Sequence, residues 1–205
     1  MKDIQGSKGH KKHHENLIER LKTEDISSLA DRIGLQMTAT GEAEIPFLGT
    51  RYLISNNGAY RSDGRNFSMI TASALIHYLL KGSSMKPAGR FVSLTELSGP
   101  WLQEGSFSKS ALESPVIKCF RGHVPALLSR AAVMGGNQGG SSGLGSISLI
   151  FDLLPNLPLQ LIFYDMDEEF PARATLLLDA NATEFIDFEA LAFLTSIFVR
   201  NLTQA

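Results

Sequence analysis

The stretch LQLIFYDMDEEFPARATLLLD, residues 159–179, holds two apolar runs separated by a short acidic segment. Apolar runs of this length, bounded by turn residues, are typical of β-strands that pair as an antiparallel hairpin. The chain must reverse through residues 169–171, which places Arg173 opposite Tyr164 or Asp165. The sequence therefore predicts a hairpin whose tip carries most of its charge.

Outside this hairpin, helical and strand-like patterns are grouped rather than strictly alternating. Residues 188–202 repeat apolar side chains at helical spacing, with Asp187 as the predicted N-cap. Residues 36–60 contain short strand-like runs and predict a small antiparallel meander, whereas residues 66–82 return to helical spacing. This grouping favours an α+β fold, with antiparallel sheets packed against helices, over a doubly wound α/β sheet.

The first residues of the chain differ from the rest in charge and in apolar content. We expect residues 1–14 to form a flexible arm, because they are basic and show no apolar period, and residues 15–205 to form a single domain. The arm contains three histidines, His10, His13 and His14, whose spacing permits loose metal binding. An arm that cannot bury its ligands binds metals weakly and unselectively.

Composition excludes several classes of protein. The formal net charge is −2, and no basic face of the kind that binds nucleic acid is visible. The single cysteine, Cys119, excludes an intramolecular disulfide and an all-cysteine metal site, which fits a reducing cytoplasm. The most apolar stretch is interrupted by prolines and polar residues, so we expect a soluble, cytoplasmic protein that does not span a membrane.

Four carboxylates stand within five positions of the hairpin, and they are the first candidates for a functional site. Two carboxylates beside Arg173 would suit a general base with an orienting partner, and Asp165, Asp167 and Glu169 would suit Mg²⁺ or Ca²⁺. Alternatively, the four residues only keep a turn soluble, with Arg173 screening its neighbours. The sequence leaves both interpretations open for the whole acidic set, Asp165, Asp167, Glu168 and Glu169.

The glycine-rich segment 135–145 is a second candidate, and Gly136 and Gly140 are its predicted ligand-binding positions. The segment runs from a helix to a strand, whereas phosphate-binding loops run from a strand to a helix. We therefore expect a mobile flap over a pocket or a plain linker. Trp101, in a loop bounded by glycine and proline, is either a ligand-binding platform or a core residue.

Two further positions carry reactive side-chain types. His77 lies in an apolar helix, where a buried, hydrogen-bonded histidine is the usual outcome. Cys119 and His123 are four residues apart and would face each other if one helix contained both. Pro125 disturbs that helix and predicts a break near His123.

Most of the chain, from about Gly34 to Leu202, resembles the bacterial and archaeal family known as domain of unknown function 3786. Three segments carry the resemblance: ALIHYLLKGSSMKPAGRFVSLTEL, the helix end AAVMGG, and LPNLPLQLIFYDMDEEFPARATLLLDANATEFIDFEALAFL. The resemblance implies no established activity. Some relatives carry a cysteine-rich iron–sulfur segment that suggests redox or corrinoid-linked metabolism, but this sequence has none.

Three hypotheses follow, from different functional classes. The first is a small-molecule-binding or accessory protein with a pocket near the acidic hairpin and the glycine-rich segment. The second is a metal-assisted hydrolase that uses the hairpin carboxylates. The third is a structural subunit that docks on a redox or corrinoid-linked partner through its acidic C-terminal face. The sequence identifies no cofactor and does not decide whether the protein is an enzyme.

Overall fold

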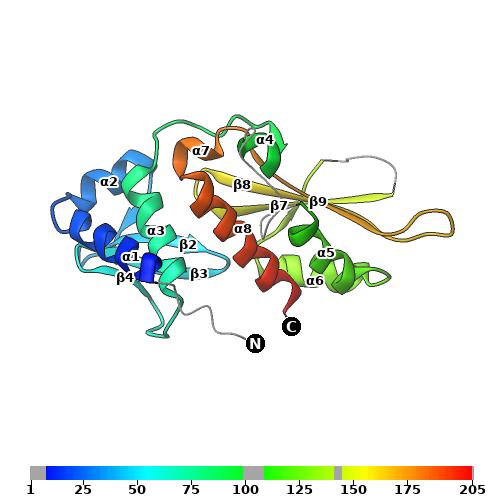
Figure 1. The fold of residues 1–205 in the computed structure, drawn as a ribbon, viewed down its shortest axis with the longest axis horizontal. Helices are drawn as coiled ribbons and strands as arrows, with labels where there is room; N and C mark the ends of the chain where they lie inside the picture. The colour runs from blue at the N-terminus through cyan, green and yellow to red at the C-terminus, as the bar shows by residue number, and fades with distance from the viewer. Residues whose placement is uncertain (1–7, 99–108, 141–144, 205) are drawn as a thin grey trace.

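A computed structural model of the chain describes residues 8–98, 109–140 and 145–204, and for residues 109 and 110 it describes the backbone alone. Within these residues the chain forms two antiparallel sheets and a set of helices, which is the predicted α+β class. Figure 1 shows the two sheets arranged along the long axis of the molecule, with α3 and α8 near its middle.

The N-terminal part is built around a four-stranded sheet in the order β1-β2-β3-β4. This is the predicted meander, and each strand pairs with the next one along the chain. Three helices accompany the sheet, and α1 and α2 both contact α3. The elements of this part are α1 (Lys8–Leu21), α2 (Ile26–Ile33), β1 (Gln36–Met37), β2 (Ala43–Phe47), β3 (Thr50–Ser55), β4 (Gly58–Arg61) and α3 (Met69–Lys81).

The C-terminal part is built around a five-stranded antiparallel sheet in the order β5-β9-β8-β7-β6. Its centre is the predicted hairpin, in which Tyr164 pairs with Arg173. Every second residue of β8 is buried, which is the period expected of a strand with one face on the core. The elements are β5 (Phe91–Ser93), α4 (Leu94–Ser98), α5 (Lys109–Phe120), α6 (Val124–Val133), β6 (Asn137–Gln138), β7 (Ser146–Leu154), β8 (Leu157–Tyr164), β9 (Arg173–Asp179), α7 (Ala182–Phe185) and α8 (Phe188–Thr203).

The terminal helix α8 begins where its apolar period predicts, after Asp187. It packs on the five-stranded sheet through β7 and also contacts the helices α3, α4, α5 and α7. The Phe198 ring meets the Phe151 ring edge-on, with 4.7 Å between centroids. Helix α5 instead contacts β9, so two helices share the cover of this sheet.

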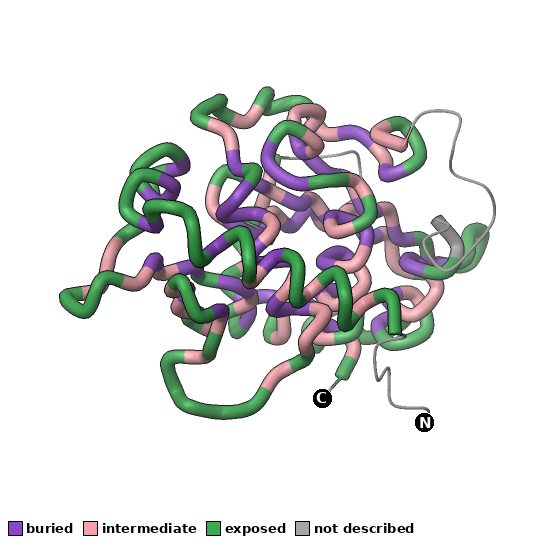
Figure 2. The backbone as a smooth tube through the Cα atoms, turned by 60° about the vertical axis from the view of Figure 1, so that its left-hand side comes forward, coloured by how far each residue is buried: buried purple, intermediate pink, exposed green. Residues whose placement is uncertain are grey.

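One continuous cluster of buried side chains joins the two parts of the fold. Helix α3 lies between them, and its Tyr78 hydroxyl donates a hydrogen bond to the Pro155 carbonyl in the β7–β8 turn. Arg32 of α2 donates to the last carbonyls of α3, those of Leu79 and Leu80. Figure 2 shows the buried segments passing through the middle of the molecule, with exposed turns around them.

The structure differs from the sequence prediction at the N-terminus. Residues 8–14, which we expected in a flexible arm, form the first turns of α1. Leu17 and Leu21 are buried and anchor the later part of this helix in the core. The polar part before them contacts α3 through His14 and Ser73. No helix in the described part of the chain is long and apolar enough to cross a membrane.

Candidate functional site

Two of the four hairpin carboxylates, those of Asp165 and Asp167, accept backbone hydrogen bonds. One oxygen of Asp167, Oδ1, accepts hydrogen bonds from the backbone N–H of Glu169 at 2.9 Å and of Phe170 at 2.7 Å. These bonds, with that from Phe170 the stronger, lower the pKa of Asp167. Asp165 Oδ1 accepts from the N–H of Gly122 at 2.7 Å, in the turn between α5 and α6. Both aspartates therefore fix backbone at the tip.

The hairpin register had led us to expect an ion pair between Arg173 and Asp165, but the structure does not contain it. No ion pair found among the described residues involves Arg173, because its strand partner is Tyr164 and Asp165 turns toward Gly122. Across the described ranges, no group of three or more histidine, cysteine, aspartate or glutamate side chains is arranged to hold a metal ion. Glu168 and Glu169 are exposed.

The glycine-rich segment is partly a strand. Asn137 and Gln138 form β6 and pair with β7 at the edge of the sheet. At Gly136 an added Cβ would stand 2.4 Å from the Phe151 ring, so this glycine permits close packing. Gly140 is exposed and has nothing near its Cβ position. The predicted flap continues into residues 141–144, and these, like Trp101, lie outside the described residues.

Cys119 and His123 are not brought together as a catalytic pair. Helix α5 ends at Phe120, and His123 is the N-cap of the next helix, α6. The Cys119 thiol instead donates to the Thr203 carbonyl at 3.7 Å. The predicted break near His123 is therefore confirmed, and it removes the helical geometry that the pair requires.

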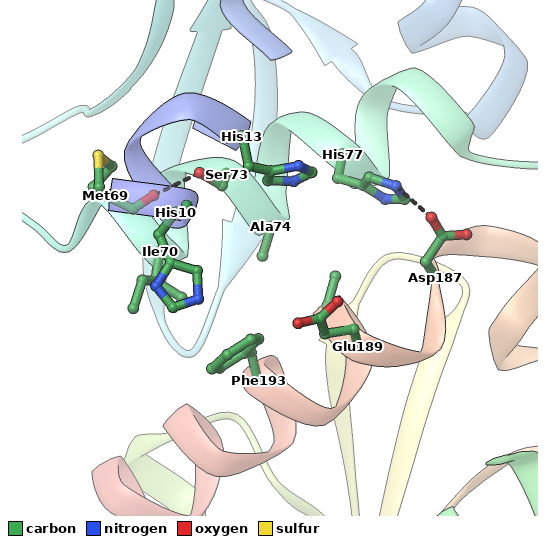
Figure 3. Close-up of a pocket in the computed structure, with 12 residues that line it drawn as sticks. His10, His13, Met69, Ile70, Ser73, Ala74, His77, Asp187, Glu189 and Phe193 are labelled. Atoms are coloured by element: carbon green, nitrogen blue, oxygen red, sulfur yellow. Dashed lines mark hydrogen bonds and ion pairs between the residues drawn. The ribbon is translucent and has the colours of Figure 1, made fainter. Parts of the chain in front are cut away.

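A cavity of about 310 Å³ lies between α1, α3 and α8, away from the acidic hairpin. Its apolar wall comes from Met69, Ile70 and Phe193. Figure 3 shows Phe193 on the α8 side, with Met69 and Ile70 on α3 opposite it. The His10 ring meets the Phe193 ring edge-on at 5.9 Å between centroids, which joins the start of α1 to α8.

The polar wall of the cavity is rich in histidine. His10 and His13 extend from α1, His77 from α3, and Glu189 from the first turn of α8. These side chains come from three helices that are far apart in the sequence. The cavity therefore exists only when both parts of the fold are assembled.

A polar contact between His14 and Ser73 joins α1 to α3 beside the cavity. Ser73 Oγ donates to the Met69 carbonyl at 2.9 Å and lies 2.9 Å from His14 Nδ1. The Ser73 hydroxyl can donate its one proton to the Met69 carbonyl while it accepts from His14 Nδ1, in the tautomer that carries the proton there. Burial is the main cause that lowers the pKa of His14. The Ser73 hydroxyl thus joins α1 to α3.

An ion-paired cluster fixes α3 against the start of α8. His77 Nε2 lies 2.8 Å from one oxygen of Asp187, and Lys81 Nζ lies 2.6 Å from the other. Lys81 also donates to the Thr183 carbonyl at 2.7 Å. The predicted N-cap role of Asp187 is therefore only positional, because its side chain makes no capping bond and is used by His77 and Lys81 instead.

Burial and charge act in opposite directions on this cluster. Burial lowers the pKa of His77, and the charge of Asp187 opposes that effect only in part. Burial disfavours the ionised form of Asp187, but the Lys81 hydrogen bond and the charges of His77 and Lys81 outweigh it and lower the pKa of Asp187. Nε2 of His77 is the ring nitrogen that faces Asp187, so it is the donor of this contact. Its Nδ1 is buried with no hydrogen-bond partner in the described structure.

The sequence indicated a local role for His77, in an apolar helix, and for Asp187, as an N-cap. One signal was present in the sequence: Ser73, His77 and Lys81 are spaced by four, so they form a polar stripe on an otherwise apolar helix. Such a stripe indicates a polar neighbour for that face. It does not show that the neighbour is the start of α8, more than a hundred residues later.

Comparison with known proteins gives a family and no nearer relative. No curated protein and no solved structure matches the chain. A family model described as a domain of unknown function (DUF3786) matches residues 25–201. The matched residues include the α3–α8 cluster and the hairpin, whereas His10 and His13 of α1 precede them. The chain belongs to this family of domains of unknown function.

Proposed function

We propose that this protein binds a small organic molecule in the cavity between α1, α3 and α8. The observation that carries the proposal is the division of the cavity into an imidazole-bearing wall and an apolar wall. Binding sites for small molecules are concave and mostly apolar, with a few placed polar groups and a volume from roughly 300 Å³ upward. A cavity of 310 Å³ is at the lower end of that range, which favours a compact ligand.

The two walls define the chemistry of the ligand. Met69, Ile70 and Phe193 would contact an apolar body, and the imidazoles of His10 and His13 would meet a polar head. The two ring nitrogens of an imidazole form hydrogen bonds, so the head group needs hydrogen-bonding atoms.

The cluster of His77, Asp187 and Lys81 would keep the cavity formed without a ligand. It joins the middle of α3 to the first residue before α8, and each bond in it is short. A preformed site loses less conformational entropy when the ligand binds. In this proposal His77 is a positioning residue, because its free nitrogen is buried rather than open to the cavity.

The metal-assisted hydrolase has less support from the same geometry. Two of its three candidate ligands already accept backbone hydrogen bonds: Asp165 from Gly122 and Met166, and Asp167 from Glu169 and Phe170. The docking hypothesis concerns the acidic C-terminal face rather than a ligand in the cavity.

The test is a fragment screen followed by imidazole-detected NMR on the full chain. Fragments with one small ring and one hydrogen-bonding group should shift the imidazole signals of His10, His13 and His77, while His123, outside the cavity, serves as the internal control. Ala190 lines the cavity and Ala132 is an exposed residue of α6, so the same change to leucine gives a matched pair.

We expect Ala190→Leu to abolish the shifts and Ala132→Leu to leave them intact. Binding that survives Ala190→Leu, or a screen in which no fragment shifts the cavity histidines, would contradict the proposal. Thermal unfolding of both variants would show that neither change disrupts the fold.

A further inference from the structure

The β8–β9 hairpin ends in a tip, residues 165–172, that projects beyond the helices. Figure 1 shows it at the end of the molecule opposite the four-stranded sheet. Residues 166–171 are all exposed. The tip therefore extends away from the core that its strands help to build, and the cavity between α1, α3 and α8 does not involve it.

Two large apolar side chains are exposed on this tip. Met166 is 55% exposed and Phe170 is 57% exposed, so each leaves more than half of its surface in water. Exposed apolar surface rimmed by polar residues marks protein contact sites, and aromatic side chains and methionine are enriched there.

The tip is held in one conformation before any partner arrives. Asp167 accepts two backbone hydrogen bonds, and its own N–H donates to the Phe170 carbonyl at 3.0 Å. Asp165 anchors the base of the tip to Gly122. A fixed turn reduces the entropy lost on association, so its apolar side chains contribute more of their burial to affinity.

The charge around the apolar pair identifies the kind of surface that would cover it. Asp167, Glu168 and Glu169 lie between Met166 and Phe170, and none of the three has an ion pair within the described part of the chain. Burying these carboxylates against a neutral or acidic surface would leave charges desolvated and uncompensated. A basic surface compensates them.

We propose that the hairpin tip docks into an apolar pocket with a basic rim on a partner protein. Phe170 and Met166 would fill the pocket, and the carboxylates between them would pair with lysine or arginine side chains around it. This proposal does not rest on ligand binding in the α1–α3–α8 cavity.

The first step of the test identifies the partner in the cells from which the gene comes. A photo-crosslinking phenylalanine analogue at position 170 should trap one protein, whereas the same analogue at position 60 should not. Tyr60 is a suitable control because it is an exposed aromatic residue on β4, in the other sheet. The absence of a product specific to position 170, or a product made of two copies of this chain, would overturn the proposal.

The second step measures affinity between the full chain and the purified partner by fluorescence anisotropy. The combined change Met166→Ser and Phe170→Ser should weaken binding about tenfold or more, as for other aromatic anchors at interfaces. Glu169→Lys should weaken binding at low salt and lose this effect at about 0.5 M salt, where charges are screened. Glu24 is an exposed glutamate far from the tip in the sequence, so Glu24→Lys should leave the affinity unchanged at either salt concentration.

Equal affinity for all variants would show that the crosslink reports proximity and not docking, and the proposal would fail. Because the substituted side chains are exposed, the variants should unfold at the same temperature as the wild type. A docking defect is then distinguishable from a folding defect.

Discussion

Leu194→Ala tests whether α8 is an essential part of the core, as its packing indicates. Leu194 is completely buried in the continuous cluster that joins the two parts of the fold. The change removes three carbon atoms, and at about 0.8 kcal/mol for each buried methylene the transfer cost alone is about 2.4 kcal/mol. Incomplete relaxation of the cavity adds to it, so the expected loss of unfolding free energy is about 2–5 kcal/mol.

The assay is urea unfolding followed by far-ultraviolet circular dichroism, with the denaturant slope compared between variants. Leu128→Ala is the matched control, because Leu128 is also helical but only partly buried. A loss below about 1 kcal/mol for Leu194→Ala, or equal losses for the two variants, would refute the argument that α8 completes the core. A changed slope would show that the compactness of one state had altered.

Phe193, the neighbour of Leu194, separates structure from function on the same helix. Its ring faces the cavity and is partly exposed. Phe193→Ala should therefore cost less stability than Leu194→Ala while removing fragment binding. Fragment binding retained by Phe193→Ala would place the ligand elsewhere.

Acidification should destabilise the protein, as measured by thermal unfolding from pH 7.5 to 5. Burial lowers the folded-state pKa of His14 and His77 below their ordinary value of 6.5, so the unfolded chain binds these protons more tightly and stability falls as the pH falls below 6.5; a flat profile would contradict this. Gly136→Ala should cost about 1–3 kcal/mol in urea unfolding, because its Cβ would stand 2.4 Å from the aromatic ring beneath it, and an unchanged midpoint would show that this packing is loose. Asp167→Ala should lower the melting temperature, because it frees two backbone N–H groups, whereas Glu169→Ala should not; equal melting temperatures would mean that the turn does not need its hydrogen bonds.

The sequence by itself determined the elements whose signals are local. The period of two in residues 157–164 and the period near 3.6 in residues 188–202 each follow from burial of one face, which any packing partner enforces. The break between α5 and α6 was predictable from Pro125, which stands in the first turn of α6, where a proline fits best. The same rule would not have placed Pro115, which lies inside α5. The family was also recognisable from sequence, and the family model confirms it.

The tertiary structure alone decided which polar side chains meet. Four carboxylates within five positions suggested a site at the hairpin, but Asp167 holds the backbone of the turn and Asp165 joins it to the α5–α6 turn. The packing of α3 against the start of α8 brings His77 to Asp187, 110 positions later, and no pattern in the sequence predicts this contact. Local periodicity reports which face of an element is buried, whereas the identity of its neighbour depends on how the two sheets pack across α3. A site built between helices from both parts of the chain is therefore visible only in the folded protein.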